Sequence, residues 1–370
     1  MDNVKMSNKT MKKGQSANYL QIAEALRNEI RAGLYAETGS FPSLTKIMRR
    51  FGVSRPSAVR SIAELKQQGL VAAKKGSGTF VSEKNRKIGL AIPGTADSEF
   101  FSAVMDGLVF NCEKYGMDLV AGDVFAVDHD KRAAQAERLA RHFVSVNVAG
   151  AIMQPVGFHE DADRVNGIIA DILGKAGIPI VLFDYDIVPP PERSGFDLVS
   201  SDHFNAGRKI AAHLMDVGAT RICCLLRRLC AESVRTRFAG VEAEVRRVRG
   251  RRASVAVAEP ADGDAIAAVL KKFRPDAIVC SNDLAAVALA NTLEKLGVRI
   301  PDDVMLAGFD DVHAAGEMRP ALTSVRQPCF ELATTAFRTL LERMDNPDLP
   351  PRNILLDTTL VVRRSTTPLH

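Results

Sequence analysis

Short apolar runs alternate with helix-like segments along residues 87–366, and this alternation constrains the fold more than any other feature of the sequence. It is typical of an α/β fold built from doubly wound parallel sheets. Ten such runs suggest two sheets rather than one. The runs read IGLAI, DLVAG, AGAIM, IPIVLFD, DLVSS, RICCLL, SVAVA, AIVCS, VMLAGFD and LTSVR.

Polar residues stand directly after several of these predicted strands. Ligands of doubly wound folds bind at the carboxyl ends of the strands, so these residues are the candidate ligand contacts. Carboxylates and amides beside apolar rings suit a sugar, because its hydroxyls need donors and acceptors and its C–H face needs a flat apolar surface. The candidates are Asp184, Asn282, Asp283, Asp310 and Gln327 after strands, Arg237 at the start of a helix, and Phe100 and Phe101 in the loop after the first strand.

Each candidate also has a structural interpretation. A strand-terminal Asp is commonly a helix cap, and an isolated Phe pair is more often part of a core than of a pocket. The sequence leaves both interpretations open at each position. The scattered histidines, including His159, His203 and His213, are interpreted as surface or packing residues.

Residues 18–82 have the pattern of a winged helix-turn-helix domain. Ile22, Leu26 and Ile30 recur at helical spacing, and the helix ends at Gly33. A second helix is expected after its N-cap Ser43, and a third, capped by Ser54, up to Gly69. Two short strand-like runs then flank a Lys- and Gly-rich turn, which predicts a hairpin.

The third helix and the hairpin are the predicted DNA contacts. An Arg on the exposed face of a helix can donate two hydrogen bonds to guanine or bind phosphate, and a basic hairpin tip suits the DNA backbone. The second helix offers free amide groups to a phosphate. The predicted contacts are Ser43, Thr45, Ser54, Arg55, Ser57, Arg60, Lys74, Lys75, Gly76, Ser77 and Gly78.

Charge is distributed unevenly between the two parts. Residues 1–86 hold 16 Lys and Arg against 6 Asp and Glu, whereas the remainder holds 33 against 38. Residues 1–86 have a net charge of +10 and the remainder has a net charge of −5, which suggests that the basic N-terminal part binds a polyanion. The alternative is a solvated basic face, which charge alone does not exclude.

The remaining features exclude several classes of protein. No apolar run approaches the roughly 18 residues that a membrane span requires, and the polar, basic residues 1–17 read as a disordered arm rather than a secretory signal. We therefore expect a cytoplasmic protein whose six cysteines are reduced. No phosphate-binding loop, dinucleotide motif or metal-ligand spacing is found, so we expect neither cofactor nor metal.

Residues 19–81 resemble the DNA-binding domain of the GntR family. The resemblance is carried by YLQIAEALRNEIRAGLY, FPSLTKIMRRFGVSRPSAVRSIAELKQQGLV and KKGSGTFV, in that order. Two positions depart from the family pattern: Thr45 replaces a usual charged residue, and Ala58-Val59 replaces a frequent Val-Arg. The resemblance therefore implies DNA binding but not a particular operator.

Residues 87–366 resemble the effector domain of the lactose/galactose repressor family, which is related to periplasmic sugar-binding proteins. The resemblance is carried by KIGLAIP, SEFF, IPIVLFD, AGRKIAAHLMDVGATRI, SVRTRFAG, VCSNDLAAVAL, GVRIPDDVMLAGFDD, RPALTSVRQP and LVVRRS. It implies a homodimer, and it implies that the eight candidates named above contact ligand. Arg227 and Arg228 replace small residues of the family, and we place them on the surface rather than on an anionic ligand.

The resemblance also implies two subdomains between which the chain crosses three times. We expect a linker at 83–87 and a sensor at 88–366, with subdomain one at about 88–193 and 327–344 and subdomain two at about 194–325 and 345–366. The whole layout is similar to that of arabinose-type repressors.

These features predict a transcription regulator, not an enzyme, whose affinity for operator DNA is controlled by a small ligand, most simply a sugar, in the sensor cleft. Members of the resembled family usually act as repressors. The alternative is a cytoplasmic sugar-binding or sugar-modifying protein without a role in gene regulation.

Overall fold

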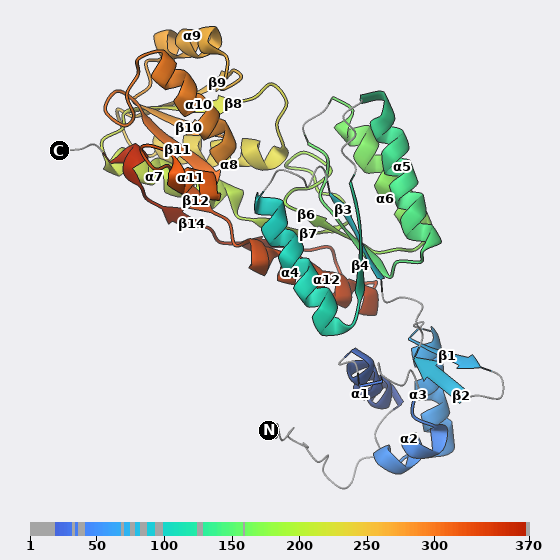
Figure 1. Cartoon of the computed structure of the whole chain (residues 1–370). Coiled ribbons are helices and arrows are strands. Elements are labelled where there is room, and N and C mark those ends of the chain that lie inside the picture. The colour runs from blue at the N-terminus through green and yellow to red at the C-terminus, as the bar shows by residue number, and fades with distance from the viewer. Residues whose placement is uncertain are drawn as a thin grey trace. The chain divides into compact units, whose positions relative to one another are not determined.

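The computed structural model describes residues 19–31, 34–35, 41–67, 70–74, 78–81, 87–92, 99–123, 129–157 and 160–367. The expected N-terminal arm and nearly all of the expected linker lie outside these residues. The chain divides into two compact units (Figure 1): residues 1–86 together with the short segment 113–118 form the first, and the remaining residues form the second. Each unit is described by itself.

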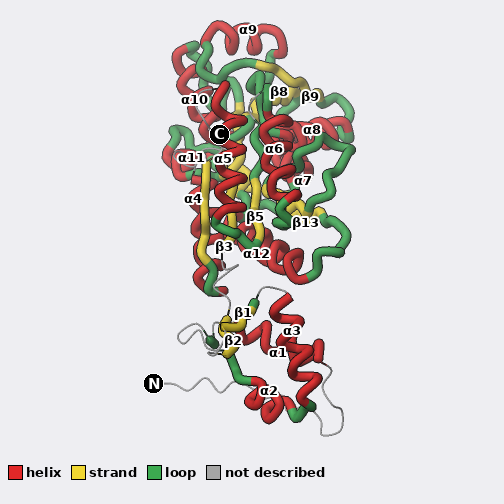
Figure 2. Tube along the Cα trace, turned by 90° about the vertical axis from the view of Figure 1, so that its right-hand side faces the viewer, coloured by secondary structure: helices red, strands yellow, loops and turns green. Residues whose placement is uncertain are grey.

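The first unit is a winged helix-turn-helix domain, as predicted (Figure 2). Its helices pack around a core that contains Ile22, Leu26 and Leu65, each with no exposed surface. Its two strands pair antiparallel from Val71↔Val81. The elements are α1 (Tyr19–Arg31), α2 (Leu44–Phe51), α3 (Arg55–Gln67), β1 (Val71–Lys74) and β2 (Gly78–Val81).

Local signals at both ends of α2 set the turn between α2 and α3. The Ser43 side chain accepts a hydrogen bond from the amide of Lys46, which caps the helix as expected. Gly52 ends the helix with φ of 64°, a left-handed conformation that favours glycine. The chain can therefore turn at once into α3.

The second unit contains two six-stranded sheets with helices on both faces (Figure 1). The described residues thus confirm the predicted α/β class, and all ten predicted runs are strands. The first sheet has the order β13-β7-β6-β5-β3-β4 and the second β14-β12-β11-β10-β8-β9, in which β14 runs antiparallel to β12. The strands are β3 (Lys87–Ile92), β4 (Asp118–Asp123), β5 (Gly150–Met153), β6 (Ile180–Phe183), β7 (Asp197–Ser201), β8 (Arg221–Leu226), β9 (Arg252–Val257), β10 (Ala277–Cys280), β11 (Met305–Asp310), β12 (Thr323–Arg326), β13 (Asn353–Leu356) and β14 (Thr359–Val361).

Apolar stripes hold the helices on the sheets. Phe143 of α5 and Ile169 of α6 pack in one core with β5 and β6, and Phe238 of α8 packs with β8 and β11 on the second sheet. The helices are α4 (Glu99–Tyr115), α5 (His129–Ser145), α6 (Ala162–Lys175), α7 (His203–Asp216), α8 (Glu232–Arg246), α9 (Gly263–Phe273), α10 (Asp283–Lys295), α11 (His313–Glu317), α12 (Cys329–Asp345) and the short η1 (Arg364–Thr366).

The points at which the chain crosses between the sheets correct the sequence prediction. We expected β7 and β13 to lie in subdomain two, with crossings near residues 193, 326 and 345. Both strands instead belong to the first sheet, because β7 pairs in parallel with β6 and β13 pairs with β7. The first and third crossings therefore fall after Ser201 and after Leu356. An apolar run predicts a strand but does not say which sheet the strand joins.

No helix in the described part of the chain is long and apolar enough to cross a bilayer. All six cysteines are free thiols, as the sequence suggested.

Two glycines let α7 and α8 pack backbone to backbone. A Cβ built on Gly207 would lie 1.8 Å from the carbonyl oxygen of Arg237, and one on Gly240 would lie 2.0 Å from that of Phe204. Such distances leave no room for a methyl group. The start of α7 and the first turns of α8 are therefore held at a fixed separation.

We predict that Gly240→Ala destabilises the second unit by about 1–3 kcal/mol or more, because the new methyl forces the two helices apart. A lower midpoint of thermal unfolding would show it. Gly167→Ala is the matched control, since a Cβ at this helical glycine meets nothing within 4 Å. The control should be neutral or slightly stabilising. Equal midpoints for the two variants would contradict the role of the close contact.

Candidate functional site

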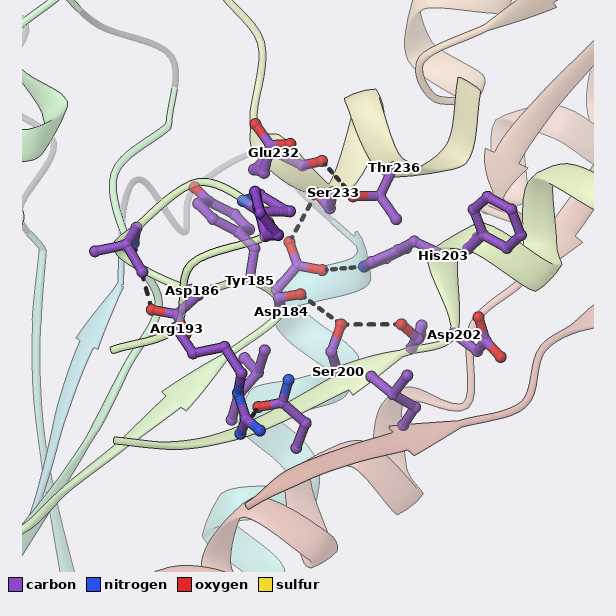
Figure 3. A pocket seen from close by; sticks show the side chains of 18 of the residues that line it. Asp184, Tyr185, Asp186, Arg193, Ser200, Asp202, His203, Glu232, Ser233 and Thr236 are labelled. Atoms are coloured by element: carbon purple, nitrogen blue, oxygen red, sulfur yellow. Dashed lines mark hydrogen bonds and ion pairs between the residues drawn. The ribbon is translucent and has the colours of Figure 1, made fainter. Parts of the chain in front are cut away.

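Asp184 is the centre of a buried polar cluster at the carboxyl end of β6. Its backbone has φ of 75°, in the left-handed region, and its side chain is nearly buried. One carboxylate oxygen lies 2.7 Å from Nε2 of His203, and the other accepts hydrogen bonds from Ser233 at 3.3 Å and Gln154 at 3.4 Å. Figure 3 shows this carboxylate between His203 and Ser233. Ser200 donates to the backbone carbonyl of Asp184 and holds the turn.

His203 connects Asp184 to α8. Its Nδ1 accepts a hydrogen bond from Nε of Arg237 at 3.2 Å. Because Nδ1 accepts, the proton of the neutral ring must lie on Nε2, where it is donated to Asp184. Asp184 and Arg237 thus select one tautomer of His203, which accepts a hydrogen bond from the cation and donates one to the anion.

Arg237 is buried and carries the connection into the second sheet. One guanidinium nitrogen donates to the carbonyl of Ser281 at 2.8 Å, and another lies 3.6 Å from Asp310. The guanidinium also stacks on Phe309, with 4.8 Å from its carbon to the ring centroid. A fixed, desolvated cation results, with its charge directed at the end of β11.

Asp310 and Gln327 close the network. The Gln327 amide donates to Asp310 at 2.7 Å and accepts from the Ser201 hydroxyl at 2.7 Å. Asp310 also has a left-handed backbone, with φ of 102°. A continuous chain of hydrogen bonds and charges therefore runs from the first sheet through α7 and α8 to the second sheet and back to β7.

The two carboxylates of this chain differ electrostatically. Burial alone would raise the pKa of Asp184, but the hydrogen bond with His203 and the charge of Arg237 hold it below the usual aspartate value. Burial raises the pKa of Asp310, although Arg237 and Gln327 oppose the shift. The charge of Arg237 thus lowers the pKa of both carboxylates. The network offers both acceptors and donors to a polar ligand.

Asn282 and Asp283 hold the structure together at the end of β10. The Asn282 side chain accepts from the amide of Ala285 at 2.9 Å and caps α10. Asp283 has no exposed surface and accepts from the Ser324 hydroxyl at 2.7 Å and the Val312 amide at 3.0 Å. These contacts are those of a structural role, which is one of the two interpretations that the sequence left open for Asn282 and Asp283.

Phe100 and Phe101 do not lie in a loop, as we had expected, but in the first turn of α4. Their ring centroids are 5.2 Å apart, and the buried Phe100 ring lies 6.4 Å from that of Phe183, which precedes Asp184. Apolar residues in a first turn look the same in sequence as residues of the preceding loop. The pair supplies an apolar wall near the buried cluster.

Sequence reasoning missed four members of the cluster: Gln154, Ser200, His203 and Ser233. Gln154 and His203 each stand within two residues of the end of a strand, which is the signal that identified Asp184. The sequence instead favours a surface or packing role for His203. Gln154 is 4% exposed, and its Oε1 has no hydrogen-bond partner in the structure, so an acceptor remains available at the end of β5.

Arg227 and Arg228 lie on the surface, as we had favoured. Arg227 pairs with Glu259 at 2.9 Å and Arg228 with Glu160 at 2.6 Å, and all four side chains are more than half exposed. Neither arginine takes part in the buried chain.

Most of the predicted DNA contacts whose side chains the structure describes are exposed, and Ser57 is half-buried. Ser43, Thr45, Ser54, Arg55 and Arg60 are exposed, whereas Ala58 on the opposite side of α3 is buried. The Ser54 and Ser57 hydroxyls lie 3.2 Å apart. The backbones of Lys74 and Gly78 pair at the end of the hairpin, and Lys75, Gly76 and Ser77 lie outside the described residues.

Two parts of the chain match known families. Residues 18–81 match the gntR family of bacterial regulatory proteins, and residues 211–366 match a periplasmic binding protein-like domain. Both matches confirm the resemblances inferred from the sequence.

Individual proteins match over larger parts of the chain. The arabinose metabolism transcriptional repressor of Halalkalibacterium halodurans is 22% identical over 373 residues, which cover 94% of this chain and 96% of the repressor. The HTH-type transcriptional repressor PurR of Mannheimia succiniciproducens is 27% identical over 288 residues, 76% of this chain and 81% of that protein. A solved LacI family transcriptional regulator from Enterococcus faecium with bound ribose is 25% identical, with a TM-score of 0.61 over 77% of this chain and 100% of that one.

We predict that Asp283 makes the fold less stable as pH rises. Burial and the nearby charge of Asp310 raise its pKa to about 8, so the folded state holds a proton that the unfolded state releases near pH 4. The associated stability is full below about pH 4 and is lost as pH rises through about 8. Asp283→Asn should remove this loss and stabilise the protein at pH 9 by on the order of 2–5 kcal/mol.

Thermal unfolding of both proteins from pH 5 to 9 tests the prediction, with the exposed Asp264→Asn as control. The difference in midpoint between Asp283→Asn and the parent should grow with pH, and that of the control should stay flat. A constant difference for Asp283→Asn would refute the prediction.

Proposed function

Because a gntR-type DNA-binding domain and a periplasmic-binding-protein-like domain are joined in this chain, we propose that it is a transcription repressor whose affinity for operator DNA is set by a small polyhydroxylated ligand. The observation that carries the proposal is the combination of the exposed recognition face of α3 with the buried donor and acceptor chain of the second unit. The repressor from Halalkalibacterium halodurans supports it, since it matches along nearly the whole of this chain.

The ligand proposed is a sugar bound in a cleft at the carboxyl ends of β5, β6, β10 and β11. A sugar hydroxyl both donates and accepts, and the buried chain offers carboxylates, an amide and a guanidinium whose positions are already fixed. The Phe100 and Phe101 rings offer apolar surface to its C–H face. The ribose bound to the relative from Enterococcus faecium supports this class of ligand.

Control of DNA binding follows if the ligand favours one arrangement of the two sheets. His203, Arg237 and Gln327 connect the sheets, so a ligand that changes their hydrogen bonds changes the relative stability of open and closed forms. An effect on operator affinity requires unequal binding to the two forms, and the coupling is then reciprocal.

We also propose that the protein acts as a homodimer in the cytoplasm, without turning over its ligand. Phe110 of α4 is 49% exposed and Phe330 of α12 is 44% exposed, and their ring centroids are 5.4 Å apart. A second copy would cover this aromatic pair. A dimer also presents two α3 helices to the two halves of a palindromic operator. The alternative, a sugar-modifying enzyme, predicts product formation when the bound sugar is incubated with the protein.

The central test measures operator affinity with and without ligand. An operator is selected from random-sequence DNA with the parent protein, and a ligand from pentoses, hexoses, uronic acids and nucleosides by thermal shift. Saturating ligand should change the dissociation constant for the operator by about 5- to 150-fold. Operator affinity that no bound ligand alters would refute the proposal.

We predict that Arg55→Ala weakens binding to the selected operator by about 10- to 100-fold, because each bidentate base contact is worth about 1–3 kcal/mol. Fluorescence anisotropy with labelled operator measures the loss. Arg338→Ala, which removes an exposed arginine of α12, is the control and should bind as the parent does. Equal binding by the two variants would exclude Arg55 as a contact.

We predict that Asp310→Asn weakens binding of the selected sugar by at least tenfold and leaves operator binding intact but insensitive to that sugar. Asparagine tolerates the left-handed backbone at this position, so the fold should persist. Calorimetric titration measures the affinity, and the exposed Asp264→Asn is the control. Unchanged affinity for the sugar would place the ligand elsewhere.

A further inference from the structure

A cavity of about 290 Å³ lies beside Asp184 and shares only part of its lining with the buried chain described above. Its wall is formed by residues 184–193, by β7 and β13, and by the first residues of α7 and α8 (Figure 3). It contains none of Arg237, Asp310 or Gln327. Asp184, His203 and Ser233 line it and also belong to the buried chain. The cavity therefore shares a wall with the cleft but has its own lining.

Part of this lining is exposed apolar surface. Phe204 is 43% exposed and Leu355 is 55% exposed, although both are large apolar side chains. Val188, Pro190 and Leu198 also line the cavity. Its volume is near the lower end of that of small-molecule pockets, whose linings are mostly apolar with a few polar groups. A small apolar body would remove this surface from water.

The charged groups of the lining are mainly acidic, and three of the five carboxylates already have hydrogen-bond donors. Asp184 is held by His203 and Ser233, as described above. Asp186 accepts from the amides of residues 188 and 194. Asp202 caps α7 by accepting from the amide of residue 205. These three carboxylates therefore already accept hydrogen bonds from the protein itself.

The other two carboxylates, Glu192 and Glu232, have at most one long ion pair among the described residues. In the described residues, no Lys or Arg lies within ion-pair distance of Glu192, and the partner of Glu232 is Arg235 at 3.8 Å. The one arginine of the lining, Arg193, donates to the side chain of Asn353 at 2.6 Å. Burial raises the pKa of Glu232, because the charge of Arg235 offsets only part of the cost of burying the carboxylate. Glu192 precedes β7 and Glu232 begins α8, so they come from the two sides of the first crossing.

We propose that this cavity binds a small organic cation, with its ammonium group against Glu192 and Glu232 and its apolar body against Phe204 and Leu355. Carboxylates beside exposed apolar surface favour such a ligand over a neutral or anionic one of the same shape. The ligand would contact both subdomains next to the crossing after Ser201. It would therefore act on the second unit from a place that the sugar does not occupy.

Calorimetric titration of the full-length protein with benzylamine tests the proposal, with benzyl alcohol as a neutral probe of nearly the same shape. Benzylamine should bind, and benzyl alcohol should bind at least tenfold more weakly. The double variant Glu192→Gln/Glu232→Gln should weaken benzylamine binding at least tenfold, because it removes both charges and keeps the side-chain volume.

Two variants serve as controls. Glu294→Gln removes an exposed carboxylate of α10 and should bind benzylamine as the parent does. Asp310→Asn alters the sugar cleft and should also retain benzylamine binding. The proposal is overturned if the two probes bind equally, if the double variant binds as the parent does, or if Asp310→Asn abolishes binding. Thermal unfolding of each variant without ligand confirms that it is folded. Because no sugar or DNA is used, the outcome is independent of the proposed repressor function.

Discussion

The buried chain from Asp184 through His203 and Arg237 to Asp310 is the interaction on which the second unit depends. Each of these side chains has lost most of its contact with water, and an isolated charge in such a place would cost several kcal/mol. The cost is offset because every charge has a partner and His203 carries the interaction between two groups that do not touch. The chain spans both sheets, so neither sheet can move without changing the partners of a buried charge.

The arrangement of α7 and α8 makes this chain possible. His203 begins one helix and Arg237 lies in the other, and their hydrogen bond needs the helices at very short distance. Gly207 and Gly240 allow that distance because neither carries a side chain at the contact. Packing and electrostatics therefore rely on each other: the glycines bring the polar groups together, and the polar groups join elements of two sheets.

The periodicity of the sequence was sufficient to predict the helices of the winged domain, the ten strands and the two-sheet architecture. It also singled out Asp184, Asp310 and Gln327 at the carboxyl ends of strands and Arg237 on a helix, and the structure brings these four side chains into one buried chain. Their contact with a ligand stays a prediction. The periodicity failed where the answer depends on tertiary contacts. Nothing local says that β7 joins the first sheet, whereas the cap formed by Asn282 is one of the two interpretations that the sequence left open. His203 was missed because a histidine at a helix start gains its meaning from Asp184 and Arg237, which are distant in sequence.

Asp184 and Asp310 combine a carboxylate that must be buried with a left-handed backbone that most residues avoid. The backbone conformation opposes folding at both positions, whereas each carboxylate is needed as a partner of the buried Arg237 or His203. A laboratory selection for heat resistance alone would therefore be expected to replace these two aspartates only together with Arg237, because a buried guanidinium without a carboxylate is costly. Such thermostable descendants would keep the architecture and lose the recognition chemistry, so the two aspartates record what the chain is selected to do besides fold.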